Sequence, residues 1–347
     1  MFIFDCEAHL WGPMDDINYF PTFKEYVNSL VGFQRSRFLQ FAREPVDWDS
    51  EEVQKEYKAT VDAIRARAYA APQADAESLI ASMNDGKVNM ACVIPEIMTD
   101  LSYGHRVRST NGYVAKAIAK YPDRLVGIAN VGPVVARGVD KANWELEHLV
   151  KEKGFKACKF YPPDDVAIND KRLWPFYNKV RELGIPLFVH TGFSWVTPGF
   201  SHTCHPMLLE EVCFDFPEIP IVAIHMGYPF TTETSLLAAK FQNFYACSSL
   251  LPRFGLGYTK KAQEILGEFL AIAGPDKLIW GVDWSGSLAG HKKAVEYLMT
   301  MQISEELQRD YHYPPITQET RAKWAGLNLA RIMKIEVPQS AQEPEKK

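Results

Sequence analysis

Hydrophobic residues in this chain fall into short runs that alternate with longer stretches of mixed character. From residue 75 onward, each short apolar run is followed by a stretch whose apolar positions recur every three or four residues. The short runs predict buried strands, and the longer stretches predict helices with one buried face. Together with the run that opens the chain, they predict eight strands, at residues 2–6, 88–94, 125–131, 155–160, 185–190, 221–225, 244–248 and 278–283.

Strands that are apolar on both faces and separated by helices indicate a parallel sheet covered by helices. A doubly wound sheet has the same pattern, but it usually binds its ligand at a glycine-rich first turn, and none follows residues 2–6. The sequence therefore predicts an α/β fold, a (β/α)8 TIM barrel. Helical patterns at residues 291–301 and 317–332 predict extra helices at the C-terminal end.

The segment after the first strand interrupts this alternation. Residues 10–72 are rich in aromatic and charged residues, and Pro13, Pro21 and Pro45 prevent a long helix. We interpret the segment as an insertion that covers the mouth of the barrel. We expect a single domain over residues 1–336 and a polar, disordered tail at 337–347.

Composition narrows the class of protein. A formal net charge of -5 gives no positive field for nucleic acid or for an anionic membrane surface. No apolar run is long enough for a membrane helix, and the N-terminus lacks the pattern of a signal peptide, so we expect a cytoplasmic protein that acts on small molecules. The cysteines form no Cys-x-x-Cys pair, and we expect them to be reduced core residues. They are Cys6, Cys92, Cys158, Cys204, Cys213 and Cys247.

Residues with metal-binding side chains stand at the ends of four predicted strands. Glu7 and His9 follow the first strand two residues apart, a spacing that directs both toward one face of a strand. The fifth, sixth and eighth strands end in His190, His225 and Asp283. Because a TIM barrel carries its active site at the carboxyl ends of its strands, we expect these five residues to meet there.

Carboxylate and imidazole groups are ligands for a divalent ion such as Zn²⁺ or Mn²⁺. A single histidine is more often a hydrogen-bonded core or loop residue, but five such residues at the ends of four strands indicate a metal site. A catalytic metal keeps one position open for water or substrate, so not all five need to bind the ion. His225 could stand beside the ion as an acid or base, because imidazole titrates near neutral pH.

These strand ends resemble those of the amidohydrolase superfamily, and in particular its aminocarboxymuconate-semialdehyde decarboxylase-like branch, also called amidohydrolase-related. Much of the superfamily has His-x-His on the first strand, whereas Glu7 in the first position is similar to the hydroxybenzoate decarboxylases that act on γ-resorcylate or 2,3-dihydroxybenzoate. The resemblance covers about residues 75–330 in addition to the first strand. Its motifs are Glu7-Ala8-His9, His190-Thr191-Gly192, His225-Met226-Gly227 and Gly281-Val282-Asp283-Trp284.

The resemblance implies that Glu7, His9, His190 and Asp283 bind one divalent ion, with Zn²⁺ the first choice and Mn²⁺ the alternative. It implies no organic cofactor, and it implies that His225 acts on the substrate. The expected reaction is non-oxidative decarboxylation of a small hydroxyaromatic or related unsaturated carboxylic acid, with Asp283 protonating the ring carbon. The resemblance also suggests a homodimer or homotetramer.

Other reactions suit the same residues. A metal-activated water would hydrolyse a lactone, amide or cyclic substrate, and hydration of an unsaturated acid needs no different ligands. Binuclear members of the superfamily carry a carboxylated lysine on the fourth strand, so Lys159 leaves the possibility of a second metal ion open. We interpret Lys159 as a structural or substrate-facing residue. A metal-free binding protein on the same scaffold is an alternative from a different class.

Arginine and tryptophan residues near the expected mouth are candidate substrate contacts. Arginine would pair with a carboxylate, and tryptophan would cover a flat ring. Surface charge and ordinary packing are the competing interpretations. The candidates are Arg35, Arg37, Trp195, Arg253 and Trp284, together with Lys159.

Overall fold

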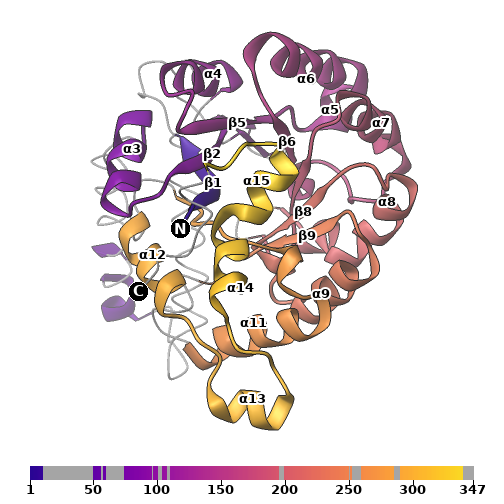
Figure 1. The fold of residues 1–347 in the computed structure, drawn as a ribbon. Coiled ribbons are helices and arrows are strands. Elements are labelled where there is room, and N and C mark those ends of the chain that lie inside the picture. Colours follow the sequence, from indigo (N-terminus) through magenta and orange to yellow (C-terminus); the bar gives the residue numbers. More distant parts are fainter. Residues whose placement is uncertain are drawn as a thin grey trace.

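Eight parallel strands form the centre of the molecule, and helices surround them (Figure 1). The computed structural model describes residues 1–10, 50–55, 58–59, 74–95, 97–100, 104–107, 110–194, 199–249, 251, 259–284 and 290–338. Neighbours in the sheet follow the chain order. The strands are β1 (Phe4–Leu10), β2 (Met90–Pro95), β5 (Leu125–Asn130), β6 (Ala157–Phe160), β7 (Leu187–His190), β8 (Ile221–Ile224), β9 (Phe244–Cys247) and β10 (Leu278–Ile279).

Backbone hydrogen bonds between β1 and the residues after β10 close the sheet. The N–H of Cys6 donates to the carbonyl oxygen of Trp280 at 3.2 Å, and the N–H of His9 donates to that of Trp284 at 2.7 Å. The predicted (β/α)8 TIM barrel is confirmed. The eighth strand is shorter than the predicted 278–283, because the backbone N–H of Trp280 donates to the carbonyl oxygen of Trp324 instead of to a neighbouring strand.

Most helices lie where the apolar periodicity predicts them, on the outside of the barrel (Figure 1). The predicted helix at 317–332 is divided by one π-helical turn, Lys323–Leu327. The helices are α3 (Ala76–Asp85), α4 (Asn111–Lys120), α5 (Val134–Arg137), α6 (Val139–Lys153), α7 (Trp174–Leu183), α8 (Leu209–Asp215), α9 (Thr231–Lys240), α11 (Thr259–Ala273), α12 (His291–Thr300), α13 (Glu305–Tyr311), α14 (Gln318–Ala322) and α15 (Asn328–Met333).

Four elements were not expected from the pattern, namely the two strands of a hairpin and the helices α5 and α13. Strands β3 (Ile97–Asp100) and β4 (Gly104–Val107) form an antiparallel hairpin outside the barrel sheet. Helix α13 follows α12, and it is too short to show a clear apolar periodicity. The predicted insertion at 10–72 and the tail at 337–347 lie almost wholly outside the described residues. Residues 51–55 of the insertion are helical.

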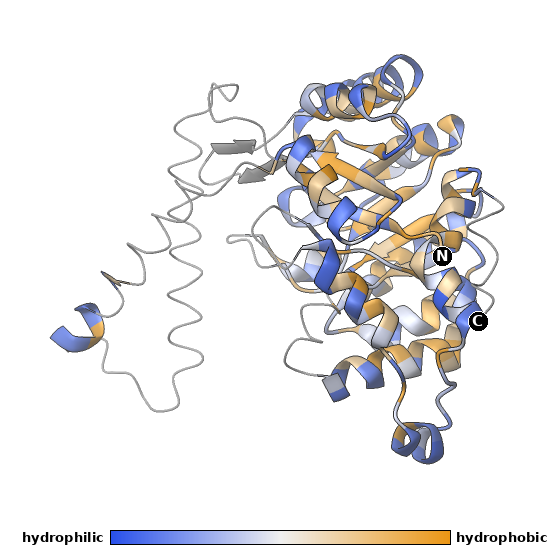
Figure 2. Cartoon of the chain, turned by 60° about the vertical axis from the view of Figure 1, so that its left-hand side comes forward, coloured by the Kyte–Doolittle hydropathy of each residue, from blue (hydrophilic) through white to orange (hydrophobic). Residues whose placement is uncertain are grey.

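The buried side chains form an inner and an outer layer on the two faces of the barrel sheet. Phe4, Cys6 and Phe188 belong to the inner layer, which α15 covers at the amino end of the barrel. A larger layer lies between the strands and the surrounding helices. Figure 2 shows the apolar strands at the centre and polar residues on the outer surfaces of the helices.

Strand β1 changes the face that it presents to the interior. Phe4 and Cys6 pack inside the barrel, but Ala8 belongs to the outer layer. Pairing with β2 shifts by one residue between Asp5 and Ala8, which is the signature of a β-bulge. Because the extra residue reverses the alternation, the side chain of Glu7 takes the inner face and Asp5 remains on the outer face.

The cysteines are as expected, since all six are free and buried. In the part of the chain that the structure describes, no helix has both the length and the apolar character required to cross a membrane.

The turn after β7 requires glycine at position 192. Gly192 has φ +88°, and a Cβ atom there would lie 2.1 Å from the carbonyl oxygen of Tyr228. We expect Gly192→Ala to lower the free energy of unfolding by about 3 kcal/mol or more, because it combines backbone strain with overpacking. Gly138→Ala is the control, since Gly138 has φ +97° with nothing within 4 Å of the added Cβ, and we expect it to cost about 1 kcal/mol. Equal losses in urea unfolding would contradict the packing argument.

Candidate metal centre

Glu7, His9 and Asp283 bring their ligand atoms together at the mouth of the barrel. One ligand atom from each of these residues lies within 4.8 Å of those of the other two. His9 Nε2 is 3.6 Å from Glu7 Oε1 and 3.5 Å from Asp283 Oδ1, which is too long for strong hydrogen bonds. Tetrahedral ligands about 2.1 Å from a zinc ion are about 3.4 Å apart, so this spacing fits a shared divalent cation.

His190 lies beside this set of three. Its ring is next to His225, with ring centroids 5.0 Å apart, and next to Tyr161, with centroids 4.8 Å apart. Burial, followed by the charges of His225 and Lys159, holds the pKa of His190 well below its usual value of 6.5. The imidazole is therefore neutral at physiological pH, as a metal ligand must be.

Two buried imidazole nitrogens at the site, His9 Nδ1 and His190 Nε2, have no hydrogen-bond partner among the described residues. Buried polar atoms are rarely left unsatisfied in proteins. A ligand or an ion at the mouth would supply the missing partner for His190. The unpartnered nitrogen and the carboxylate and imidazole donor set both fit a divalent cation.

Glu7 is fully buried, and both of its carboxylate oxygens are held by hydrogen bonds. Lys159 Nζ donates to Oε1 at 2.8 Å, and Ser249 Oγ donates to Oε2 at 2.8 Å. Burial alone would raise the pKa of Glu7, but the positive charge of Lys159, with smaller contributions from His225 and His9, holds the pKa well below its usual value. Glu7 is therefore an anion at neutral pH.

Ser249 also fixes the proton position on His225. The Ser249 hydroxyl lies 2.8 Å from His225 Nδ1. A hydroxyl has one proton, and since Ser249 donates it to Glu7, its oxygen accepts a hydrogen bond from the Nδ1–H of His225. In the neutral ring, Nε2 of His225 then carries a lone pair.

Ser249 was not predicted as a site residue, although its position in the sequence carries a signal. Ser249 follows β9, the seventh barrel strand, just as His190 and His225 stand at the ends of theirs. Serine is not a typical ligand for zinc, so its residue type does not indicate a metal site.

The candidate substrate residues have different positions. Lys159 is buried and contacts Glu7. Trp284 is also buried, and its ring centroid lies 6.3 Å from that of His291, so its surroundings are those of a packed core residue. The remaining candidates, Arg35, Arg37, Trp195 and Arg253, lie outside the described residues.

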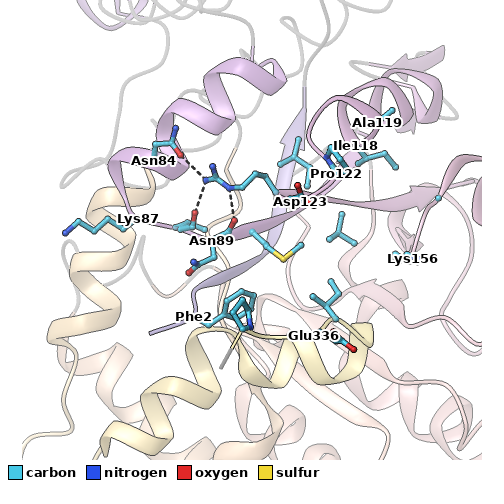
Figure 3. Close-up of a pocket in the computed structure, with 18 of the residues that line it drawn as sticks. Phe2, Asn84, Lys87, Asn89, Ile118, Ala119, Pro122, Asp123, Lys156 and Glu336 are labelled. Carbon is cyan, nitrogen blue, oxygen red and sulfur yellow. Dashed lines mark hydrogen bonds between the residues drawn. The ribbon is translucent and has the colours of Figure 1, made fainter. Parts of the chain in front are cut away.

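A cavity of about 1090 Å³ lies at the opposite end of the barrel, near the amino ends of β1, β2, β5 and β6 (Figure 3). Arg124 lines it, and its guanidinium donates to the carbonyl oxygens of Asn89 and Val88 and to the side-chain oxygen of Asn84. These bonds tie α3 to the sheet. Because the candidate ligands lie at the carboxyl ends of the strands, this cavity does not belong to the site.

The neutral state of His190 predicts how stability depends on pH in metal-free protein. The unfolded chain takes up a proton on this histidine near pH 6.5, whereas the folded chain resists protonation. Stability should therefore fall as the pH drops below about 6.5, by up to about 1.4 kcal/mol per pH unit from this group. Urea unfolding in the presence of a chelator, from about pH 8 to about pH 5, measures this slope.

His190→Gln should reduce that slope, and His202→Gln, a substitution at an exposed position, should leave it unchanged. An identical slope in wild type and His190→Gln would show that folding does not lower the pKa of His190.

Curated relatives match different shares of the chain. Protein fluG of Emericella nidulans is 31% identical over 107 residues, which are 30% of this chain and only 12% of that protein. The gamma-resorcylate decarboxylase of Polaromonas sp. strain JS666 is 23% identical over 270 residues, which cover 66% of this chain and 78% of the relative.

Solved structures share the fold over 96% of this chain. The 5-carboxyvanillate decarboxylase of Sphingomonas paucimobilis has a TM-score of 0.60 at 18% identity and is 99% covered. The Novosphingobium aromaticivorans 5-carboxyvanillate decarboxylase, complexed with manganese and 4-hydroxy-3-methoxy-5-nitrobenzoic acid, has a TM-score of 0.59 at 15% identity and is 96% covered. A probable 2-pyrone-4,6-dicarboxylic acid hydrolase of Acinetobacter baumannii has a TM-score of 0.57 at 18% identity and is 100% covered.

A family model described as Amidohydrolase matches residues 4–334, nearly the whole of the described barrel. This match agrees with the closed barrel and with the acidic and histidine residues at its strand ends. The chain belongs to this amidohydrolase family.

Proposed function

We propose that the protein is a metal-dependent, non-oxidative decarboxylase of a small hydroxyaromatic carboxylic acid. The observation that carries the proposal is the cluster of Glu7, His9 and Asp283 at the mouth of an amidohydrolase barrel. The gamma-resorcylate decarboxylase and 5-carboxyvanillate decarboxylase among the similar proteins support this reaction.

Glu7, His9 and Asp283, with His190 as a fourth candidate, would hold one divalent ion. When bound, such an ion would attract the carboxylate and the adjacent phenolic oxygen of the substrate and stabilise negative charge on that oxygen. Zn²⁺ is our first choice and Mn²⁺ the alternative, since a similar structure contains manganese. A homodimer or homotetramer and a cytoplasmic location stay predictions.

The two carboxylates of the site have environments that suit different roles. Both oxygens of Glu7 accept hydrogen bonds in a fully buried position, so Glu7 is suited to stay ionised. The side chain of Asp283 is 16% exposed at the mouth, where a substrate would approach. Asp283 is therefore the better candidate to take up a proton from solvent and, in its protonated form, to deliver it to the ring carbon that bears the carboxylate.

After this protonation, the bond between the ring carbon and the carboxylate carbon breaks. The electron pair of that bond returns to the ring and restores aromaticity, and carbon dioxide leaves. His225 would face the substrate through Nε2, because Ser249 holds Nδ1. A neutral His225 would accept the phenolic proton, and the resulting imidazolium would donate a hydrogen bond to the phenolate.

Hydrolysis is the second candidate function, because the fold is shared with a probable 2-pyrone-4,6-dicarboxylic acid hydrolase. In that reaction Asp283 would take a proton from the attacking water, and His225 would stabilise the developing oxyanion. The same side chains would serve both reactions, so the product formed is what separates them.

The first test is carbon dioxide release from 2,6-dihydroxybenzoate and 2,3-dihydroxybenzoate, measured with the metal content of the purified chain. We expect about one ion per chain. Chelation should abolish release, and added Zn²⁺ or Mn²⁺ should restore it. Asp283→Asn should lower the rate at least about 100-fold, because the amide cannot deliver the proton. Asp123→Asn, an exposed change at the other end of the barrel, is the control.

Ring opening of a 2-pyrone dicarboxylate without carbon dioxide release from either benzoate would favour the hydrolase. A chain that binds no divalent ion would contradict the metal centre itself.

The hydroxyl of Ser249 should matter for catalysis more than for folding. We expect Ser249→Ala to reduce kcat about 10- to 100-fold and to change the pH profile of kcat, because His225 loses the partner that fixes its proton. Ser248→Ala is the matched control. It also removes a fully buried hydroxyl, which donates to the carbonyl oxygen of Ile279 and accepts from Trp324. Equal effects of the two substitutions on kcat and its pH profile would rule out the positioning role.

A further inference from the structure

A second buried carboxylate, Asp5, lies on β1 two residues before Glu7, on the other face of the strand. Its Oδ1 accepts the backbone N–H of Glu7 at 3.0 Å and the backbone N–H of Val282 at 2.9 Å. The side chain is fully buried. One carboxylate oxygen thus joins β1 to the strand end that carries Asp283.

The bond to Glu7 coincides with the β-bulge in β1. The register against β2 shifts between Asp5 and Ala8, and a bulge disrupts the hydrogen bonds of the ladder locally. Buried backbone N–H groups require an acceptor. Asp5 provides one for Glu7, and so stabilises the bulge that turns the Glu7 side chain into the barrel.

The bond to Val282 acts on the other side of the site. Asp283, the next residue, has φ +53°, an uncommon conformation for a residue other than glycine. A backbone hydrogen bond at Val282 therefore limits the movement of Asp283 relative to β1.

His291 holds Asp5 from the outside. Its Nε2 lies 3.0 Å from Asp5 Oδ2, and its Nδ1 lies 2.9 Å from Ser82 Oγ. Ser82 belongs to α3, and His291 is the first residue of α12, so two outer helices support the carboxylate. His291 is fully buried. With its proton on Nε2, the neutral ring satisfies both contacts.

We propose that Asp5, held by His291, is a positioning residue that sets the distance between Glu7 and Asp283 for a divalent ion. It would not touch the ion, because it lies on the outer face of β1. The inference rests on the proposed metal centre, and it adds that the affinity for the ion depends on a carboxylate outside the barrel interior.

The test compares Asp5→Ala with Asn328→Ala. Asn328 is also buried, and its side chain donates to the carbonyl oxygens of Pro275 and Leu278, at the amino end of β10. Each substitution therefore removes two hydrogen bonds between a side chain and the backbone. We expect Asp5→Ala to weaken Zn²⁺ and Mn²⁺ binding about 10- to 100-fold in chelator competition, and Asn328→Ala to leave affinity within about twofold.

Two further variants keep the test decisive if Asp5→Ala does not fold. Asp5→Asn keeps an oxygen acceptor for both N–H groups, so we expect affinity within about threefold of wild type. His291→Leu removes the donor to Oδ2 at similar volume, and we expect about 3- to 10-fold weaker binding. The proposal would be overturned if His291→Leu bound Zn²⁺ and Mn²⁺ with wild-type affinity while Asp5→Ala either was insoluble or also kept wild-type affinity.

Hydrogen exchange on metal-free protein separates this inference from the proposed function. The amides of Glu7 and Val282 should exchange at least about tenfold faster in His291→Leu or Asp5→Ala, and at the wild-type rate in Asn328→Ala. Unchanged exchange in both Asp5 and His291 variants would refute the positioning role. If wild type binds no ion, the metal centre fails while the exchange rates still decide whether Asp5 holds the two strand ends.

Discussion

Glu7 places an ionised carboxylate inside the barrel, and the residues around it are arranged to satisfy that charge. A buried charge without partners would cost far more free energy than a domain can supply. Lys159 from β6 pairs with one oxygen, and Ser249 after β9 donates to the other. The carboxylate thus joins β1 to strands on other sides of the barrel, and through Ser249 it orients His225.

Closure of the barrel is what makes this arrangement possible. Glu7 and Ser249 are 242 residues apart in sequence, yet their side chains are in contact because β1 is bonded to the residues that follow β10. The strand ends could be predicted from sequence, since an apolar run that finishes in His190 or Asp283 has a distinctive pattern. Their meeting point followed from the fold, because parallel strands in a barrel finish at one rim.

Other features could not be predicted, for physical reasons that differ. Ser249 was not predicted because a hydroxyl carries no metal-site signal until its partners are known. The β3–β4 hairpin was not predicted because its strands have only four residues each, too few for a clear alternation of apolar and polar positions. The roles of Lys159 and Trp284 depended on burial: the first is a counter-ion of Glu7, and the second is packed in the core. The sequence gives the charge and size of a side chain. Which groups that side chain stabilises depends on its neighbours, and only the fold supplies them.

One backbone irregularity in strand β1 decides which of its side chains face the interior of the barrel. Strict alternation from Phe4 and Cys6 would carry Ala8 to the inner face and would leave Glu7 and His9 outside, against the helices. The bulge after Asp5 reverses this assignment. The same change of phase leaves Asp5 on the outer face, where His291 reaches it, and lets its carboxylate hold the irregular backbone. In the proposed metal centre, the inner carboxylate would serve an ion because the outer one fixes the strand that carries it.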